Sequence, residues 1–266
     1  MMKEKLRLGR EEVCLKLLSE ENANELAGDV IFVHGMGGDL YETWAANEQT
    51  RHWGMWLAEE RPDLRFLTLG YPASPSHWLG RGMPLQDRAT SILALLSADR
   101  IGKRPLCFVT HSLGGLLVKQ MLQEAISGGT KEYKQMMKAV KGVVFLSTPH
   151  TGSNIATIVN RLGTLLRTTE VIEDLQDNGA MLRKLNQWYV NHIENLRIRN
   201  KILFEKWDTK GFRIVDESSG GITVKGETAI PIDADHFGIC KPESKDALVY
   251  KITRQFINEI FPDSRT

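Results

Sequence analysis

The feature that most constrains the fold is an apolar stretch that runs directly into a serine and then into a helical pattern. Residues 105–118 read PLCFVTHSLGGLLV, with Ser112 at the junction. This layout is typical of a nucleophile elbow, a strained turn that exposes a serine hydroxyl beside the N-terminus of a helix. Gly114 meets the need for a small residue two positions after the serine, whereas Thr110 stands where glycine is usual. The pattern predicts that Ser112 is a nucleophile at the carboxyl end of a strand.

A glycine-rich loop follows an earlier apolar stretch. Residues 29–33 read DVIFV and lead into HGMGG at residues 34–38. Glycines allow backbone N–H groups to approach a developing oxyanion without a side chain in the way. We therefore expect the N–H groups of Met36 and Leu113 to form an oxyanion hole. The alternative is a phosphate-binding loop, but neither a following Lys-Ser or Lys-Thr pair nor a G-x-G-x-x-G spacing is present.

His236 is the best candidate for a general base. It follows a strand-like segment near the C-terminus, in the order serine, acid, histidine that one large class of serine enzymes uses. His150 is its rival, because it also follows a predicted strand, but it precedes every plausible acid in the chain.

The acid that would orient His236 is less constrained by the sequence. Glu217 ranks first, because it follows a short apolar segment between the last two predicted strands. The alternates are Glu205, at a strand end, Asp216 and Asp208. Two further carboxylates, at positions 233 and 235, are too close in sequence to reach back to the imidazole.

Five side chains or glycines are expected to line the pocket, because they lie within the motifs or directly after predicted strands. They are His34, Gly35, His111, Tyr71 and His150. No metal or organic cofactor is needed for the chemistry that Ser112 and His236 predict.

Five local motifs together resemble those of the lipase-like α/β-hydrolases that include the serine-active-site-containing proteins and, more distantly, the glycosylphosphatidylinositol inositol-deacylases. The motifs lie at residues 32–44, 69–71, 110–120, 145–153 and 233–241. The resemblance implies an α/β-hydrolase fold and a serine esterase, lipase or acyl-transfer activity, in some members on phospholipids. Two departures from the family pattern are Thr110 in the elbow and the lack of an Asp-x-x-Val-Pro motif for the acid.

Alternating strand and helix patterns predict a mostly parallel sheet covered on both faces. The predicted strands are 13–17, 30–33, 64–69, 106–110, 143–147, 201–205 and 228–232, and the predicted helices are 53–60, 86–96, 113–126 and 246–260. Residues 154–199 are helical throughout and form an insertion where such enzymes often carry a lid. The apolar stripe from Ile155 to Leu166 either packs on the sheet, which is the commoner case, or covers the pocket and contacts lipid.

Composition agrees with one α/β-hydrolase domain over residues 1–266. With 42% hydrophobic and 25% charged residues the chain can bury a full core. A net charge of +1 argues against nucleic-acid binding. The three cysteines are scattered, as expected of reduced thiols in a cytoplasmic protein. No secretory signal or transmembrane run is recognised, which leaves peripheral membrane contact open.

The sequence therefore predicts a serine hydrolase that cleaves carboxylic esters of small molecules or lipids through an acyl-enzyme. A transacylase would share every residue named here, and a catalytically silent binding module on the same fold is the third alternative. The sequence does not reveal the oligomeric state.

Overall fold

The computed structural model describes residues 12–18, 26–73, 83–150, 155–166, 175–211, 214–215 and 227–262. Their core is a seven-stranded sheet in the order β1-β3-β2-β4-β5-β6-β7. The strands are β1 (Cys14–Leu17), β2 (Gly28–Val33), β3 (Leu64–Gly70), β4 (Leu106–His111), β5 (Val140–Leu146), β6 (Arg199–Glu205) and β7 (Ile230–Ile232). All neighbouring pairs are parallel except β1 with β3. The predicted α/β-hydrolase fold is confirmed.

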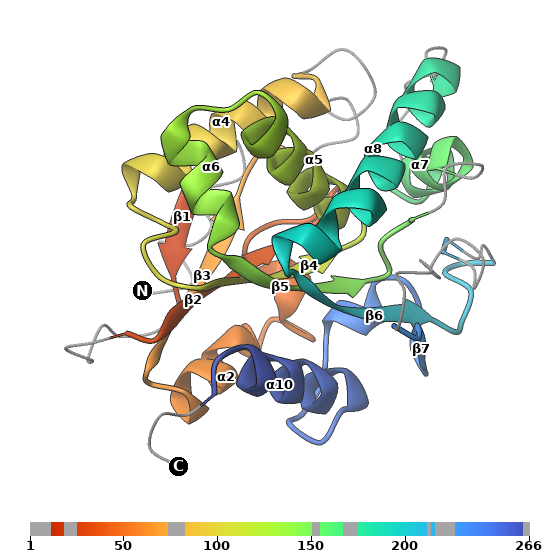
Figure 1. Cartoon of the computed structure of the whole chain (residues 1–266). Helices are drawn as coiled ribbons and strands as arrows, with labels where there is room; N and C mark the ends of the chain where they lie inside the picture. Colours follow the sequence, from red (N-terminus) through yellow and green to blue (C-terminus); the bar gives the residue numbers. More distant parts are fainter. Residues whose placement is uncertain are drawn as a thin grey trace.

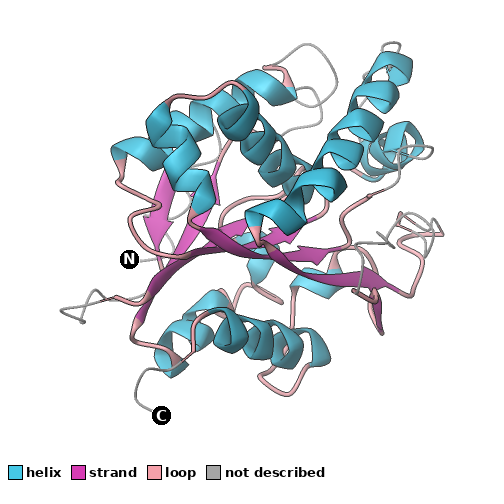
Figure 2. Ribbon diagram, in the orientation of Figure 1, coloured by secondary structure: helices cyan, strands magenta, loops and turns pink. Residues whose placement is uncertain are grey.

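Helices cover both faces of this sheet (Figures 1 and 2). One face carries α4 (Leu85–Ala98), α5 (Leu113–Ser127), α6 (Lys131–Lys138) and α8 (Leu175–Leu196), and the other carries α2 (Gly54–Glu60) and α10 (Leu248–Ile260). Alternate side chains of β4 pack into the two helical layers, because successive side chains of a strand point to opposite faces of the sheet. Phe108 packs with the α5 side, and Cys107 and Val109 pack with the α2 and α10 side. Such two-sided burial explains why the strands read as nearly continuous apolar runs.

The elements agree with the sequence pattern to within a few residues, with one omission. Helix α6 is absent from the prediction because its sequence, KEYKQMMK, is short and mostly polar. Its two buried residues, Met136 and Met137, are adjacent rather than spaced along a helix face. The short 3₁₀ helices η1 (Glu42–Trp44) and η2 (Gly238–Cys240) complete the described elements.

The expected helical insertion contains α7 (Ile155–Leu165) and α8. Side chains of α7 and of the first half of α8 pack on residues beside the predicted nucleophile. Farther along α8, Tyr189 and Ile193 pack in the core on the sheet. Ile158 and Leu162 are buried in one cluster with Met36, Leu113 and Leu116. We call these two helices the cap.

The parallel strands bring the sequence motifs to one edge of the sheet. The loop after β2, the serine after β4 and the last residue of β6 all lie at carboxyl ends of strands, where open α/β sheets place their ligands. Pairing of β6 with β7 sets Glu205 opposite Ile232, four residues before His236. Ser112, Glu205 and His236 are therefore neighbours in space.

Candidate active site

Ser112 occupies a strained turn between β4 and α5. Its backbone has φ 51° and ψ −128°, a conformation that a residue with a side chain rarely adopts. The neighbouring loop approaches closely, because a Cβ at Gly35 would lie 2.8 Å from the Ser112 Cβ and 2.9 Å from the His111 carbonyl oxygen. Only glycine allows this approach.

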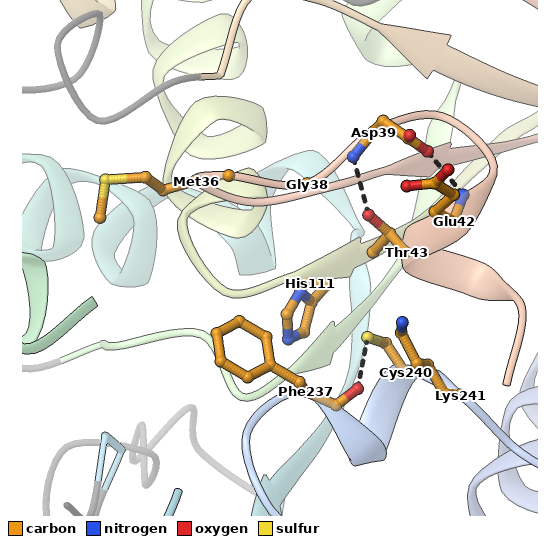
Figure 3. A pocket seen from close by; sticks show the side chains of 10 residues that line it. Met36, Gly38, Asp39, Glu42, Thr43, His111, Phe237, Cys240 and Lys241 are labelled. Carbon is orange, nitrogen blue, oxygen red and sulfur yellow. Dashed lines mark hydrogen bonds between the residues drawn. The ribbon is translucent and has the colours of Figure 1, made fainter. Parts of the chain in front are cut away.

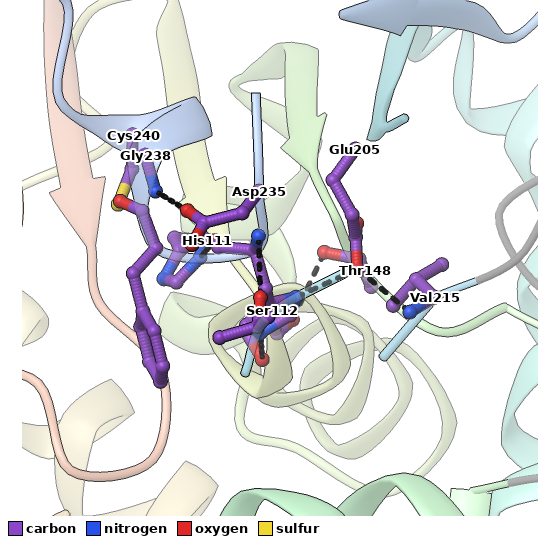
Figure 4. A network of polar contacts seen from close by, with 11 residues as sticks. His111, Ser112, Thr148, Glu205, Val215, Asp235, Gly238 and Cys240 are labelled. Carbon is purple, nitrogen blue, oxygen red and sulfur yellow. Dashed lines mark hydrogen bonds and ion pairs between the residues drawn. The ribbon is translucent and has the colours of Figure 1, made fainter. Parts of the chain in front are cut away.

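Three buried side chains from three different segments of the chain form a hydrogen-bonded chain (Figure 4). His236 Nε2 lies 2.9 Å from Ser112 Oγ, and His236 Nδ1 lies 3.1 Å from Glu205 Oε1. An ionised carboxylate can only accept, so the imidazole carries its proton on Nδ1. Nε2 is then free to accept the proton of the Ser112 hydroxyl. Ser112 is 2% exposed, and the other two residues are fully buried.

The carboxylate at Nδ1 is Glu205, the second-ranked candidate for the acid. Glu217 and Asp216 lie outside the described residues, and Asp208 is exposed to solvent. Glu205 Oε1 also accepts a hydrogen bond from the Val215 N–H at 2.7 Å, which holds the carboxylate in place. The strand-end position of Glu205 was the sequence signal for it, and chain order alone gave it no advantage over Glu217.

The two predicted oxyanion donors lie on either side of Ser112. In the loop after β2, the Gly37 N–H donates to Ala73 O and the Gly38 N–H donates to Gly35 O. Within the described part of the chain, the N–H groups of Met36 and Leu113 have no hydrogen-bond acceptor outside helix α5. They are therefore available to a developing oxyanion.

The five expected pocket residues have different surroundings. His111 donates a hydrogen bond from Nε2 to the His236 carbonyl oxygen, 2.8 Å away, and it lines the cavity described below. Gly35 contacts the elbow. His34 and Tyr71 are buried and stack on each other, with ring centroids 4.2 Å apart. Burial lowers the pKa of His34 to about 4, so this ring is neutral at physiological pH.

His150 takes part in a separate buried cluster. Its Nδ1 lies 2.7 Å from Lys119 Nζ, which also donates to Asn186 Oδ1 on α8 at 2.7 Å. Burial holds the pKa of both Lys119 and His150 well below their usual values. The cluster joins α5 to the cap, and the structure does not bring His150 to Ser112 as a base.

A cavity of about 150 Å³ opens beside the elbow (Figure 3). Its lining mixes polar and apolar groups and comes from the segment after β2, from His111 and from the segment after His236. The lining residues are Met36, Gly37, Gly38, Asp39, Glu42, Thr43, His111, Phe237, Cys240 and Lys241. Met36 and Phe237 belong both to this lining and to the apolar cluster under the cap.

Among the described residues, no group of three or more His, Cys, Asp or Glu side chains is arranged to hold a metal ion. None of the described helices combines the length and apolar composition that crossing a bilayer requires.

Solved structures share this fold at low sequence identity. A carboxylesterase structure from Nitrososphaera gargenis matches with a TM-score of 0.54 and 12% identity, covering 93% of this chain and 94% of that one. A thermophilic esterase from Thermogutta terrifontis matches with a TM-score of 0.52 and 13% identity, covering 94% of each chain. At this identity the likeness supports the fold alone.

Sequence comparison identifies the family. Protein SERAC1 of Mus musculus is 30% identical over 260 residues, which cover 88% of this chain and 39% of the relative. Protein SERAC1 of Homo sapiens is 30% identical over 261 residues with the same coverage. The chain thus spans about two fifths of the length of these relatives. A family model described as "Putative serine esterase (DUF676)" matches residues 27–183, which include the glycine-rich loop after β2 and the turn at Ser112. The chain therefore belongs to this serine esterase family, on an α/β-hydrolase fold.

Proposed function

We propose that this protein hydrolyses carboxylic esters through an acyl-enzyme on Ser112. The observation that carries the proposal is the buried hydrogen-bonded chain from Ser112 through His236 to Glu205. A serine hydroxyl is a weak nucleophile until a neighbouring base takes its proton. Membership of a serine esterase family supports the same reaction.

The proposed reaction has two halves. Ser112 Oγ attacks the ester carbonyl carbon while His236 Nε2 takes the hydroxyl proton. The N–H groups of Met36 and Leu113 stabilise the oxyanion of the tetrahedral intermediate. His236 then returns the proton to the leaving alcohol, and the acyl group remains on Ser112. A water molecule, deprotonated by His236, releases the acid and restores the serine.

Glu205 is the proposed acid, in place of Glu217. Its role is to hold the imidazole in the Nδ1–H tautomer and to stabilise the imidazolium that forms during each proton transfer.

The surroundings of Ser112 support an ester with an apolar acyl group and a small polar alcohol. Cap residues Ile158 and Leu162 present apolar side chains beside Leu113, where an acyl chain would be sheltered from water. The cavity beside the elbow, whose lining includes the polar side chains of Glu42, Thr43 and Lys241, has about the volume that holds a benzene molecule in an engineered protein. The Lys241 ammonium makes no hydrogen bond or ion pair with the described residues, and it is available to an alcohol oxygen in this cavity.

Labelling by a fluorophosphonate tests the proposal, because the probe reacts with an activated serine. The Ser112 Oγ attacks phosphorus and displaces fluoride. We expect wild-type protein to be labelled and the Ser112→Ala and His236→Ala variants to remain unlabelled. His192→Ala is the matched control, since this half-buried histidine lies on α8 and bonds to the Trp188 carbonyl. Labelling of Ser112→Ala, or none of the folded wild type, would contradict the proposal.

The same preparation then reports on the ester itself. With a fixed decanoyl group, the ester of ethylene glycol should be cleaved faster than the ester of dodecanol, because the long alcohol exceeds the cavity. Equal rates would contradict the assignment of the cavity to the alcohol and leave the activated serine unaffected.

A further inference from the structure

The segment that follows β3, residues 71–73, contacts the proposed oxyanion loop, residues 34–38, at two points. The Tyr71 hydroxyl donates a hydrogen bond to the His34 carbonyl oxygen, and the two rings stack with only 6° between their planes. Two residues on, the Ala73 carbonyl accepts from the Gly37 N–H at 2.6 Å. The loop between these points contains Gly35 and Met36, so the segment sets the position of the proposed oxyanion donor.

His34 carries this constraint to the peptide group between Gly35 and Met36. The His34 Nδ1 lies 3.0 Å from the Gly35 carbonyl oxygen, which also accepts from the Gly38 N–H at 3.2 Å. A carbonyl accepts only, so the neutral His34 ring donates from Nδ1. In a trans peptide the C=O and the next N–H point in opposite directions. With the Gly35 carbonyl held on one side, the Met36 N–H is directed to the other side.

Arg88 on α4 fixes the segment from behind. Its guanidinium donates to the Pro72 carbonyl and, at 3.3 Å, to the Met83 carbonyl, and it lies 5.7 Å from the centre of the Tyr71 ring. Arg88 is 2% exposed and Tyr71 is 1% exposed. Neither lines the cavity beside Ser112. Their hydrogen bonds serve the backbone that surrounds the site.

We infer that Tyr71 is a positioning residue for the oxyanion hole, acting through His34 on the Met36 N–H and supported by Arg88. The inference rests on the proposed function, since it presupposes an oxyanion at Ser112. It also gives Tyr71 a role different from the pocket lining that its sequence position suggested. A single lost hydroxyl would leave the stacked ring in place but release the His34 carbonyl.

Tyr71→Phe removes this hydroxyl alone. We expect kcat for an activated ester to fall by about 10- to 100-fold, with KM nearly unchanged. This fall in kcat is no larger than the fall that removal of an oxyanion donor itself causes. Tyr189→Phe is the matched control, because the Tyr189 hydroxyl is equally buried and donates to Asn200 Oδ1 at 2.6 Å. It should lower the unfolding midpoint while leaving kcat within about twofold.

A second readout separates positioning from a general structural effect. Addition of Ser112 Oγ to a trifluoromethyl ketone, with its proton passing to His236, gives a hemiketal oxyanion. We expect Tyr71→Phe to weaken this inhibitor by the same factor as kcat/KM, while a substrate-shaped alcohol that forms no oxyanion binds as to wild type. Equal losses for both ligands, or an unchanged kcat, would overturn the inference.

The remaining outcomes are also decisive. If Tyr71→Phe does not fold, Arg88→Lys is measured in the same two assays, and an unchanged ketone affinity overturns the inference. A wild type that neither hydrolyses esters nor binds the ketone overturns the proposed function as well. An active wild type whose Tyr71→Phe variant behaves like Tyr189→Phe overturns this inference alone.

Discussion

At the scale of single residues, the Glu205 carboxylate is in direct contact with His236. Its Oε1 accepts from both His236 Nδ1 and the Val215 N–H, inside a fully buried site. The carboxamide of Glu205→Gln has nearly the same shape, and its oxygen can still accept from the His236 and Val215 N–H groups. It carries no negative charge, so it no longer stabilises the imidazolium that forms when His236 takes the serine proton.

We therefore expect Glu205→Gln to lower kcat by about 10³- to 10⁴-fold, as for triad acids elsewhere. Steady-state hydrolysis of an activated ester measures this. Glu259→Gln, at a residue on α10 that pairs with Arg199 on the surface, should behave as wild type. If Glu205→Gln keeps near-wild-type kcat, another carboxylate, such as Glu217, orients His236.

At the scale of elements, the close approach of α5 to the loop after β2 depends on Gly114. A Cβ at this position would overlap the His34 carbonyl oxygen and lie 2.5 Å from that of Val33. Both are backbone atoms, so they cannot turn away as a side chain could. Helix α5 and the loop after β2 can pack at this distance only through glycine.

Gly114→Ala should consequently destabilise the protein by about 1–3 kcal/mol, the usual range for overpacking, and should also reduce fluorophosphonate labelling. Gly128→Ala is the control at the other end of α5, where the nearest atom to a new Cβ is 3.9 Å away. Urea unfolding followed by circular dichroism compares the two. Equal urea midpoints for both variants would contradict the prediction, because they would show that α5 and the loop after β2 can move apart at little cost in stability.

At the scale of the whole molecule, buried histidines couple folding to pH. Burial lowers the pKa of His34 to about 4 and that of His52 to about 3, against 6.5 in an unfolded chain. Below pH 6.5 these two rings bind protons in the unfolded state but stay neutral in the folded state, so folding stability falls as pH decreases. Above pH 6.5 both states are neutral at these rings and the effect vanishes.

Between pH 7 and pH 5 we expect each of these histidines to reduce the free energy of unfolding by up to about 2 kcal/mol, before most carboxylates titrate. Urea midpoints at pH 7, 6 and 5 measure the loss. His52→Phe, which removes one titrating ring from an aromatic cluster with Phe32 and Trp53, should flatten the profile. A midpoint that rises toward pH 5 would contradict this account.

Local sequence by itself determined the fold class and most of the elements. It also predicted Ser112 and His236 as site residues, because each lies in a turn that follows a strand. These features depend on residues that are close along the chain. The spacing of apolar residues and the positions of glycines there are compatible with few local structures. The same reasoning missed α6, whose helix depends on packing its two methionines against the sheet layer.

Tertiary structure alone decided which carboxylate faces His236 and what Tyr71 contacts. Any acidic residue in the right interval satisfies chain order, and only the parallel pairing of β6 with β7 brings Glu205 to the imidazole. Tyr71 and His34 are 37 residues apart, and a hydrogen bond across that separation leaves no local pattern. Contacts of this kind arise from how elements pack, which the order of residues along one strand or loop does not encode.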